Sequence, residues 1–308
     1  MLDQLSPDGL PRDRGIGRIE LEICTKWVAS VHMPTPNFLK DFDELCALFL
    51  AQGIPMVGPG FYDHPNFLMV ERSDPTFLNC YARFVQQRPR DETYEARVRR
   101  VVPRVAEILH RELEAEGRLG ACIDLSMVLS RILDAEGIWN YMVKGSLTLT
   151  FPRSVQPGPI YFWPMDEGDF EAGHVWISAP PYDVIDLTVR QQPYPKPAMR
   201  RMLAPYVALD TITSVAPTIV DIVSEEIQMQ VRRQRGYVPP DLHFHLNPIL
   251  RDVFVGFPAN EKRIGRVRMR YVPCAFSASN EPLEEITNQR WNGRYGFEIY
   301  RDMIKGQT

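Results

Sequence analysis

The hydrophobic periodicity of the chain changes from helical to strand spacing between residues 122 and 189, and this change limits its possible folds most. After Gly120 in the sequence, apolar residues recur at helical spacing and form a stripe of Leu125, Val128, Leu129, Ile132 and Leu133. Two later runs, 174–178 and 184–189, alternate apolar and polar residues as half-buried strands do. The pattern predicts an α+β fold in which a helix packs on an antiparallel sheet.

A cysteine stands at the start of the predicted helix. Cys122 follows Gly120, and Gly137 is placed to end the same helix. In a first helical turn, unpaired backbone N–H groups and the helix dipole favour an anion, so a thiol there is a candidate nucleophile. The same N–H groups can stabilise a developing oxyanion. The alternative is a packing role, because Cys122 continues the apolar stripe and free cysteines are commonly buried.

The two strand-like runs carry a histidine and a carboxylate. The connection 179–182 contains two prolines, whose φ of about −65° excludes a primed two-residue turn, so a loop of three or five residues is expected. Either length places His174 and Asp186 on one face of the ladder with β-carbons about 5 Å apart. The competing carboxylate, Asp183, is at the turn, where aspartate more often bonds its own backbone. The opposite, buried face is expected to hold Val175, Ile177, Ile185, Leu187 and Val189.

The order Cys122, His174, Asp186 supplies a nucleophile, a base and a group that orients the base. The stretch 120–138 resembles the nucleophile helix of the transglutaminase-like superfamily, in which a cysteine, an acidic residue and an apolar helix lead to Gly-Ile and a strand ending in glycine. Here that strand is 141–145. The runs 174–177 and 185–188 resemble the histidine strand and the third-member strand of the family.

The resemblance spans roughly residues 100–190 and implies a papain-like core, at residues 96–192, with a Cys122–His174–Asp186 triad. It implies a cysteine-dependent hydrolase of an amide, peptide or isopeptide-like bond that acts through a thioester acyl-enzyme. One alternative is an acyl transferase, like transglutaminase or arylamine N-acetyltransferase. Another is a non-catalytic binding scaffold with the same fold. The expected partner is a protein, peptide or amide substrate, and neither a cofactor nor a metal is needed.

The loop before His174 is a candidate for one edge of the substrate-binding cleft. We place Trp163 and Asp166 from this segment, together with Trp176, among the substrate-binding residues. The loop is acidic, with Asp166, Glu167, Asp169 and Glu171, and this charge favours a cationic or amine-bearing substrate. Its hydrophilic character also favours water over an amine as the acyl acceptor. A flexible polar loop without a binding role is the alternative.

Composition sets outer limits. A formal net charge of −4 over 308 residues makes nucleic acid an unlikely partner, and no apolar run has the length of a membrane span. The acidic N-terminal sequence lacks the features of a signal peptide. The odd number of five cysteines, without CxxC spacing, speaks against a disulfide scaffold and favours a cytoplasmic location. The oligomeric state stays open.

Two regions flank the predicted core. Residues 1–95 are expected to be mixed α/β, with a strand at 20–28, a helix capped by Thr35–Pro36 and another helix through Phe77 and Val85. Residues 193–308 are expected to hold one helix from about 217 to 235 and a basic strand near 266–271. Whether these regions are separate domains or pack on the core stays open. Pro103 is expected to start or kink a helix that precedes the nucleophile helix.

Other candidate sites are weaker. His243 and His245 have metal-ligand spacing on an expected strand, but no further ligands cluster near them in the sequence, which favours a surface pair. Three arginines share one face of the basic strand: Arg266, Arg268 and Arg270. A solvated face or a guarded edge strand is favoured for them, with phosphate or nucleic-acid binding as the alternative. Four cysteines are expected to be packing residues: Cys24, Cys46, Cys80 and Cys274.

Overall fold

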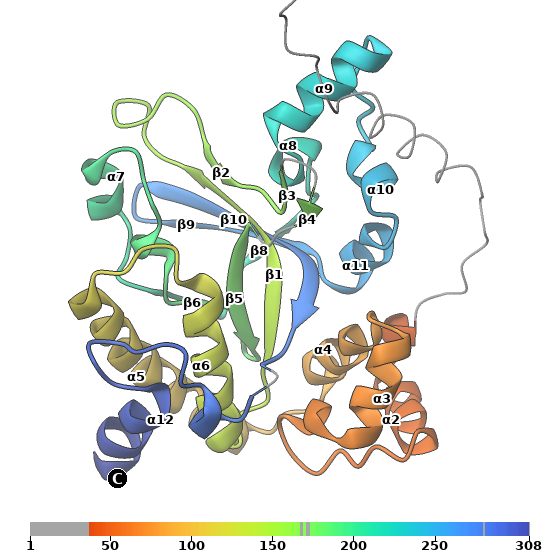
Figure 1. Ribbon diagram of the computed structural model, residues 1–308, viewed down its shortest axis with the longest axis vertical. Helices are drawn as coiled ribbons and strands as arrows, with labels where there is room; N and C mark the ends of the chain where they lie inside the picture. The colour runs from red at the N-terminus through yellow and green to blue at the C-terminus, as the bar shows by residue number, and fades with distance from the viewer. Residues whose placement is uncertain (1–36, 167–168, 171–172, 280, 308) are drawn as a thin grey trace, which may run out of the picture. The chain divides into compact units, whose positions relative to one another are not determined.

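The computed structural model describes residues 37–166, 169–170, 173–279 and 281–307 (Figure 1). Contacts between residues join Asn37–Thr308 in one compact unit. The described parts of the three predicted stretches all fall within this unit. The strand expected at residues 20–28 lies outside the described residues.

An antiparallel sheet runs through this unit, and the α+β prediction is confirmed. Its strands follow the order β7-β6-β5-β1-β10-β9-β8, and β2 pairs with β1 beside β5. The strands are β1 (Tyr141–Thr150), β2 (Ile160–Phe162), β5 (His174–Ala179), β6 (Tyr182–Asp186), β7 (Val207–Leu209), β8 (Thr213–Val215), β9 (Ala259–Ile264) and β10 (Val267–Ser277). A separate two-stranded hairpin is formed by β3 (Met165–Asp166) and β4 (Asp169–Phe170).

The basic strand lies inside the sheet. β10 pairs with β1 on one side, from Met142↔Ser277 to Thr150↔Arg268, and with β9 on the other. Its odd-numbered residues Val267, Met269 and Tyr271 are fully buried. The prediction of a guarded edge strand for Arg266–Arg270 is therefore wrong, because strand order depends on contacts across the whole chain and not on local alternation.

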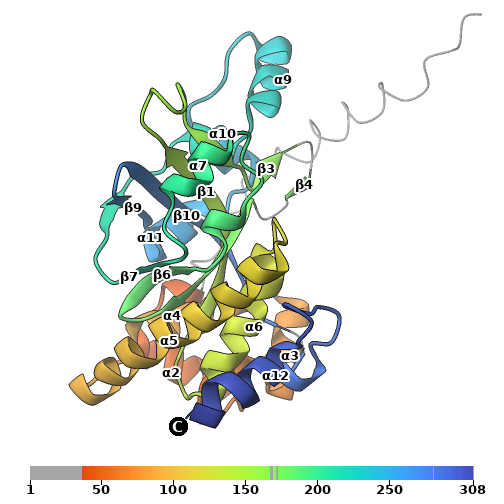
Figure 2. The same cartoon turned by 90° about the vertical axis from the view of Figure 1, so that its left-hand side faces the viewer.

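Two long helices lie next to each other in Figure 2: α5 (Glu92–Glu116) and α6 (Cys122–Ala135), the predicted nucleophile helix. α6 packs on β5, and α5 packs on α6. Gly137 follows α6 with φ +69°, so the predicted glycine stop is confirmed. Pro103 lies inside α5, which begins eleven residues earlier behind the N-cap Asp91, so it does not start that helix.

The interior between these helices and the sheet holds four of the five residues predicted for the buried face. Val189 instead begins a 3-10 helix and packs in the other hydrophobic core, so its prediction is wrong. Val175, Ile177, Ile185 and Leu187 pack with the apolar stripe of α6. The C-terminal segment adds Trp291 and Ile304 to the same interior. It contains the 3-10 turns η4 (Leu283–Glu285) and η6 (Lys305–Gln307), the helix α12 (Gly296–Ile299) and the π-helical turn η5 (Tyr300–Ile304).

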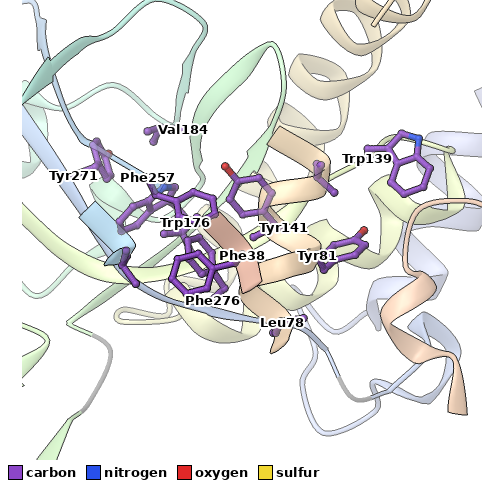
Figure 3. Packing of buried hydrophobic residues seen from close by; sticks show 14 of the residues in the cluster. Phe38, Leu78, Tyr81, Trp139, Tyr141, Trp176, Val184, Phe257, Tyr271 and Phe276 are labelled. Carbon is purple, nitrogen blue, oxygen red and sulfur yellow. The ribbon is translucent and has the colours of Figure 1, made fainter. Parts of the chain in front are cut away.

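A second, aromatic core packs N-terminal helices against the opposite face of the sheet, on which Tyr141, Trp176 and Val184 lie. These elements are η1 (Asn37–Leu39), α2 (Phe42–Ala51), η2 (Phe61–Asp63), α3 (Pro65–Ser73) and α4 (Phe77–Gln87). Figure 3 shows Phe38 of η1 close to Tyr141, Trp176 and Phe276 from the sheet. The helix predicted through Phe77 and Val85 is confirmed as α4.

The first helix starts later than predicted. α2 begins at Phe42, because the Asp41 side chain accepts a hydrogen bond from the Glu44 N–H and Glu44 caps Asp41 in return. This reciprocal capping box satisfies two backbone N–H groups at the start of the helix. Thr35 and Pro36, the predicted cap, lie outside the described residues.

Short helices complete the unit: η3 (Val189–Gln191), α7 (Pro197–Met202), α8 (Ile219–Ile222), α9 (Glu225–Arg235), α10 (Leu242–Leu246) and α11 (Leu250–Gly256). The single helix predicted from 217 to 235 is wrong. Val223 is extended and bridges to Met165, and the Ser224 side chain caps a new helix by accepting from the Ile227 N–H. His243 and His245 lie on α10, so the strand predicted for them is also wrong.

Candidate active site

Cys122 is the first residue of α6. Ahead of it, Gly120 has φ +70°, which favours glycine, and its N–H donates to the Gln191 carbonyl at 3.0 Å. The N-cap residue is Ala121, which offers no side-chain acceptor to the N–H groups of the first turn. The cysteine is 8% exposed. The start of α6 thus keeps its N–H groups available to an anion beside the thiol.

An arginine holds the segment ahead of Cys122 in place. Arg118 donates to the carboxylate of Asp124, in the first turn of α6, and to the side chain of Gln289. Its guanidinium also lies over the Trp291 ring, 5.4 Å from the ring centroid. These contacts tie the first turn of α6 to the C-terminal segment, which fixes where the thiol lies.

His174 is the first residue of β5 and lies opposite Gly145 of β1. Gly145 permits a close approach of strands, because a β-carbon there would lie 2.0 Å from the Val272 carbonyl oxygen. The imidazole is fully buried among aromatic rings, with centroids 6.0 Å from Phe162 and 6.4 Å from both Trp176 and Tyr271. This packing leaves the ring little freedom to turn.

The hairpin between β5 and β6 corrects the predicted loop. Ala179 pairs with Tyr182, so the turn has two residues, and its Pro180–Pro181 peptide bond is cis, as in a type VI turn. The prediction of three or five residues is wrong, because it excluded primed two-residue turns but not other two-residue turns. A bulge in β6 then shifts the register, so that Ile177 pairs with Ile185.

The bulge returns His174 and Asp186 to one face of the hairpin. Continuing the Ile177↔Ile185 pairing puts Asp186 opposite Trp176 and makes it the diagonal neighbour of His174. The Asp186 Oδ2 accepts a hydrogen bond from His174 Nε2 at 2.7 Å. Asp183 instead lines a cavity with Gln86 and Trp176. The structure thus brings together His174 and Asp186, the preferred carboxylate.

Two further side chains hold Asp186. Tyr271 on β10 donates its hydroxyl to Oδ2 at 2.9 Å, and Thr188 donates its N–H and hydroxyl to Oδ1 at 2.9 and 3.1 Å. The carboxylate is 1% exposed, so these donors replace its water. The sequence reasoning missed both residues. The Asp-x-Thr spacing is a local signal for Thr188, whereas no local signal points to Tyr271.

The surroundings of the buried pair favour its charged form. Burial opposes the charged form of His174, but the Asp186 carboxylate and, after it, the Cys122 thiol outweigh burial and raise the His174 pKa to about 10. Burial likewise opposes the Asp186 charge, and the positive His174 outweighs it, so the Asp186 pKa is lowered. The Nδ1 atom of His174 has no hydrogen-bond partner of ordinary geometry. Cys122 lies near the imidazole, since it acts on the His174 pKa, but its sulfur forms no hydrogen bond of ordinary geometry with Nδ1.

The other described cysteines are in different surroundings. Burial raises the pKa of both Cys80 and Cys274 to about 12, and it also raises the pKa of Cys46. No histidine is among the groups that act on these three thiols. Cys24 lies outside the described residues. Cys122 is thus set apart by its neighbour His174.

The three predicted substrate-binding residues lie in different surroundings. Trp163 Nε1 donates to the Val220 carbonyl at 2.8 Å, and its ring stacks on Tyr161 at 5.1 Å. Asp166 is exposed on β3. Trp176 is 1% exposed and packs edge-on against Tyr271 at 5.2 Å, where it supports the His174 ring. Contact with substrate stays a prediction for all three, and Glu167 and Glu171 of the same loop lie outside the described residues.

A buried glutamine adjoins the segment before Cys122. Gln191 is fully buried, and neither its side-chain oxygen nor its nitrogen has a hydrogen-bond partner. Its backbone carbonyl accepts from Gly120, which places it beside the turn that leads into α6. Unpaired buried amides are rare because they lose their bonds to water. The sequence carried no signal for this residue.

A scan against protein-family models, a search of curated proteins and a search of solved structures each found no match. Within the described part of the chain, no three or more His, Cys, Asp or Glu side chains are grouped as they would be around a metal ion. Among the described helices, none has the length and apolar character needed to cross a membrane.

Proposed function

We propose that this chain is a cysteine-dependent hydrolase of amide or peptide bonds with a papain-like, transglutaminase-like core. The observation that carries the proposal is the buried pair of His174 and Asp186, with Nε2 and Oδ2 2.7 Å apart, next to a thiol on the first residue of a helix. The sulfur of Cys122 thus lies beside both an imidazole that can exchange a proton and the N–H groups of a helix N-terminus, which are the neighbours that a nucleophilic cysteine needs.

The reaction would have two halves, formation of a thioester on Cys122 and its hydrolysis, and His174 would transfer a proton in each. The Cys122 sulfur attacks the carbonyl carbon, and the N–H groups of the first turn of α6 stabilise the oxyanion. His174 then gives its proton to the leaving amine, and the C–N bond breaks to leave a thioester. Water attacks the thioester as His174 takes its proton, and the C–S bond breaks to release a carboxylic acid.

Asp186 would orient the imidazole through this cycle. Its bond to Nε2 leaves Nδ1 as the nitrogen that exchanges protons with the thiol and the amine. The donors Tyr271 and Thr188 hold the carboxylate in place, so that its position does not depend on the charge of His174.

The acyl acceptor is proposed to be water. The segment between Asp166 and Gly173 is hydrophilic and acidic, which does not favour the dry channel that would protect a thioester until an amine arrives. An acyl transferase is the enzymatic alternative. The low exposure of Cys122, 8%, favours the non-catalytic scaffold as a second candidate.

The test measures turnover of activated esters and of a peptide library, with and without a labelled primary amine. We expect release of free acid, little label on the product, and complete loss of turnover in Cys122→Ala. Cys46→Ala is the matched control, because it removes a partly buried thiol that has no histidine neighbour. Label on most of the product would show that the acyl acceptor is an amine and not water. Turnover retained in Cys122→Ala would refute the proposal.

A further inference from the structure

A small cavity lies at the hairpin between β9 and β10, away from the candidate active site. It has a volume of about 260 Å³ and is lined by Thr150, Phe151, Pro152, Arg263, Arg266 and Arg268. Thr150 is five residues along β1 from Gly145, the partner of His174, which corresponds to about 16 Å of extended strand. The lining holds three guanidinium groups and no carboxylate.

The register of three strands brings this lining together. Thr150 of β1 lies opposite Arg268 of β10, and Arg268 lies opposite Arg263 of β9, so the three side chains form one row on one face of the sheet. Arg266 is in the two-residue turn of the same hairpin, next to Gly265 with φ +58°. All three arginines are exposed. Two arginines directly opposite each other repel, and an anion between them would relieve this repulsion.

The neighbouring row shows how this face binds a carboxylate. There, Thr148, Arg270 and Glu261 are opposite one another in the same order of strands. The Thr148 hydroxyl donates to Asp221 Oδ1 at 2.9 Å, and Arg270 Nη1 donates to Asp221 Oδ2 at 2.9 Å. A threonine on β1 and an arginine on β10 thus hold an anion supplied by α8.

The outer row repeats the threonine and the arginine without the acid. Arg270 is fully neutralised, since Glu261 also accepts from its Nε and Nη2 at 3.0 and 2.9 Å. Arg268 comes no closer than 3.9 Å to Glu261, and among the described residues neither Arg263 nor Arg266 has an ion pair. The cavity therefore holds three arginines whose only ion pair, within the described part of the chain, is the 3.9 Å contact of Arg268 with Glu261, whereas the inner row holds one arginine and two carboxylates.

We propose that this cavity binds the phosphate of a small phosphate monoester, in the position that Asp221 takes in the inner row. A phosphate dianion matches three guanidinium groups and a hydroxyl donor better than a single carboxylate does. The apolar side of the cavity, formed by Phe151 and Pro152, offers a surface for the esterified organic group. The volume lies just under the usual range for small-molecule sites, which limits that group to a small one.

The test is calorimetric titration of the full chain with phenyl phosphate, inorganic phosphate and phenol at one fixed salt concentration. We expect saturable binding of phenyl phosphate, weaker binding of inorganic phosphate and none of phenol. Arg263→Gln with Arg268→Gln should weaken phenyl phosphate binding by roughly tenfold for each arginine removed. Arg232→Gln with Arg233→Gln, on the exposed face of α9, is the control of equal charge change and should bind as the parent does.

A further variant separates loss of the site from loss of the fold. Thr150→Asp places a carboxylate in the outer row, and we expect it to abolish phenyl phosphate binding without lowering the thermal unfolding midpoint. Absence of saturable phosphate binding, or equal weakening in the α9 control, would overturn the proposal. So would tighter, steeply salt-dependent binding of a short oligonucleotide, because that result would assign the arginines to nucleic acid.

Discussion

Replacing Asp186 by asparagine tests the buried pair most directly. The amide keeps an oxygen for Thr188, but its NH₂ group then faces His174 Nε2 and the Tyr271 hydroxyl, both of which are donors to the carboxylate. The imidazole must lose its charge and accept at Nε2. Removing one partner of a buried ion pair costs about 3–5 kcal/mol. Because His174 can become neutral, we expect the lower end, about 3 kcal/mol at neutral pH.

The pH dependence of this loss has a definite sign. The His174 pKa is raised from 6.5 to about 10, so its contribution to stability is complete below pH 6.5 and is lost as the pH rises toward 10. The Asp186 pKa is lowered from 3.8, so its contribution is complete above pH 3.8 and is lost as the pH falls through the lowered value. The difference in free energy of unfolding between parent and Asp186→Asn should therefore be largest between pH 3.8 and pH 6.5.

Urea unfolding followed by circular dichroism, at about pH 5.5, 7.5 and 9.5, measures that difference. Asp183→Asn is the matched control on the same strand. Burial raises the pKa of Asp183, so loss of its charge should cost little. A difference that stays constant from pH 5.5 to 9.5, or a variant as stable as the parent throughout, would refute the charged pair.

Three further outcomes are expected. Iodoacetamide near pH 6 should alkylate Cys122 well before Cys274, whose pKa of about 12 reflects burial, and mass spectrometry of the labelled peptides measures both rates; equal rates would make Cys122 a packing residue. Tyr271→Phe removes one hydrogen bond to a buried carboxylate and should lower the free energy of unfolding by about 1.5–3 kcal/mol, which denaturant titration checks. Arg270→Gln should lower the thermal unfolding midpoint far more than Arg266→Gln, because it leaves the buried Asp221 without its cation; equal midpoints would contradict this.

Local patterns were enough for the elements that carry the candidate triad. The stripe from Leu125 to Leu133 predicted α6 with Cys122 in its first turn, and alternation predicted β5 and β6. His174 and Asp186 share one face because of the bulge in β6, and not because of the predicted loop length. These predictions succeed because apolar spacing over a few residues decides which face of a helix or strand is buried. The capping box of Asp41 was also present in the sequence and was overlooked.

Long-range contacts decided what local patterns could not. The sequence alone determined the helix, the strands and the order of the three candidate residues. The position of β10 between β1 and β9, which brings Tyr271 to Asp186 across 85 positions of the chain, came from tertiary structure. Tertiary structure also decided the different partners of Arg268 and Arg270. Both point to the same face of β10, but α8 supplies an acid only to Arg270. Alternation fixes the face on which a side chain lies, whereas its partner depends on which distant segment packs there.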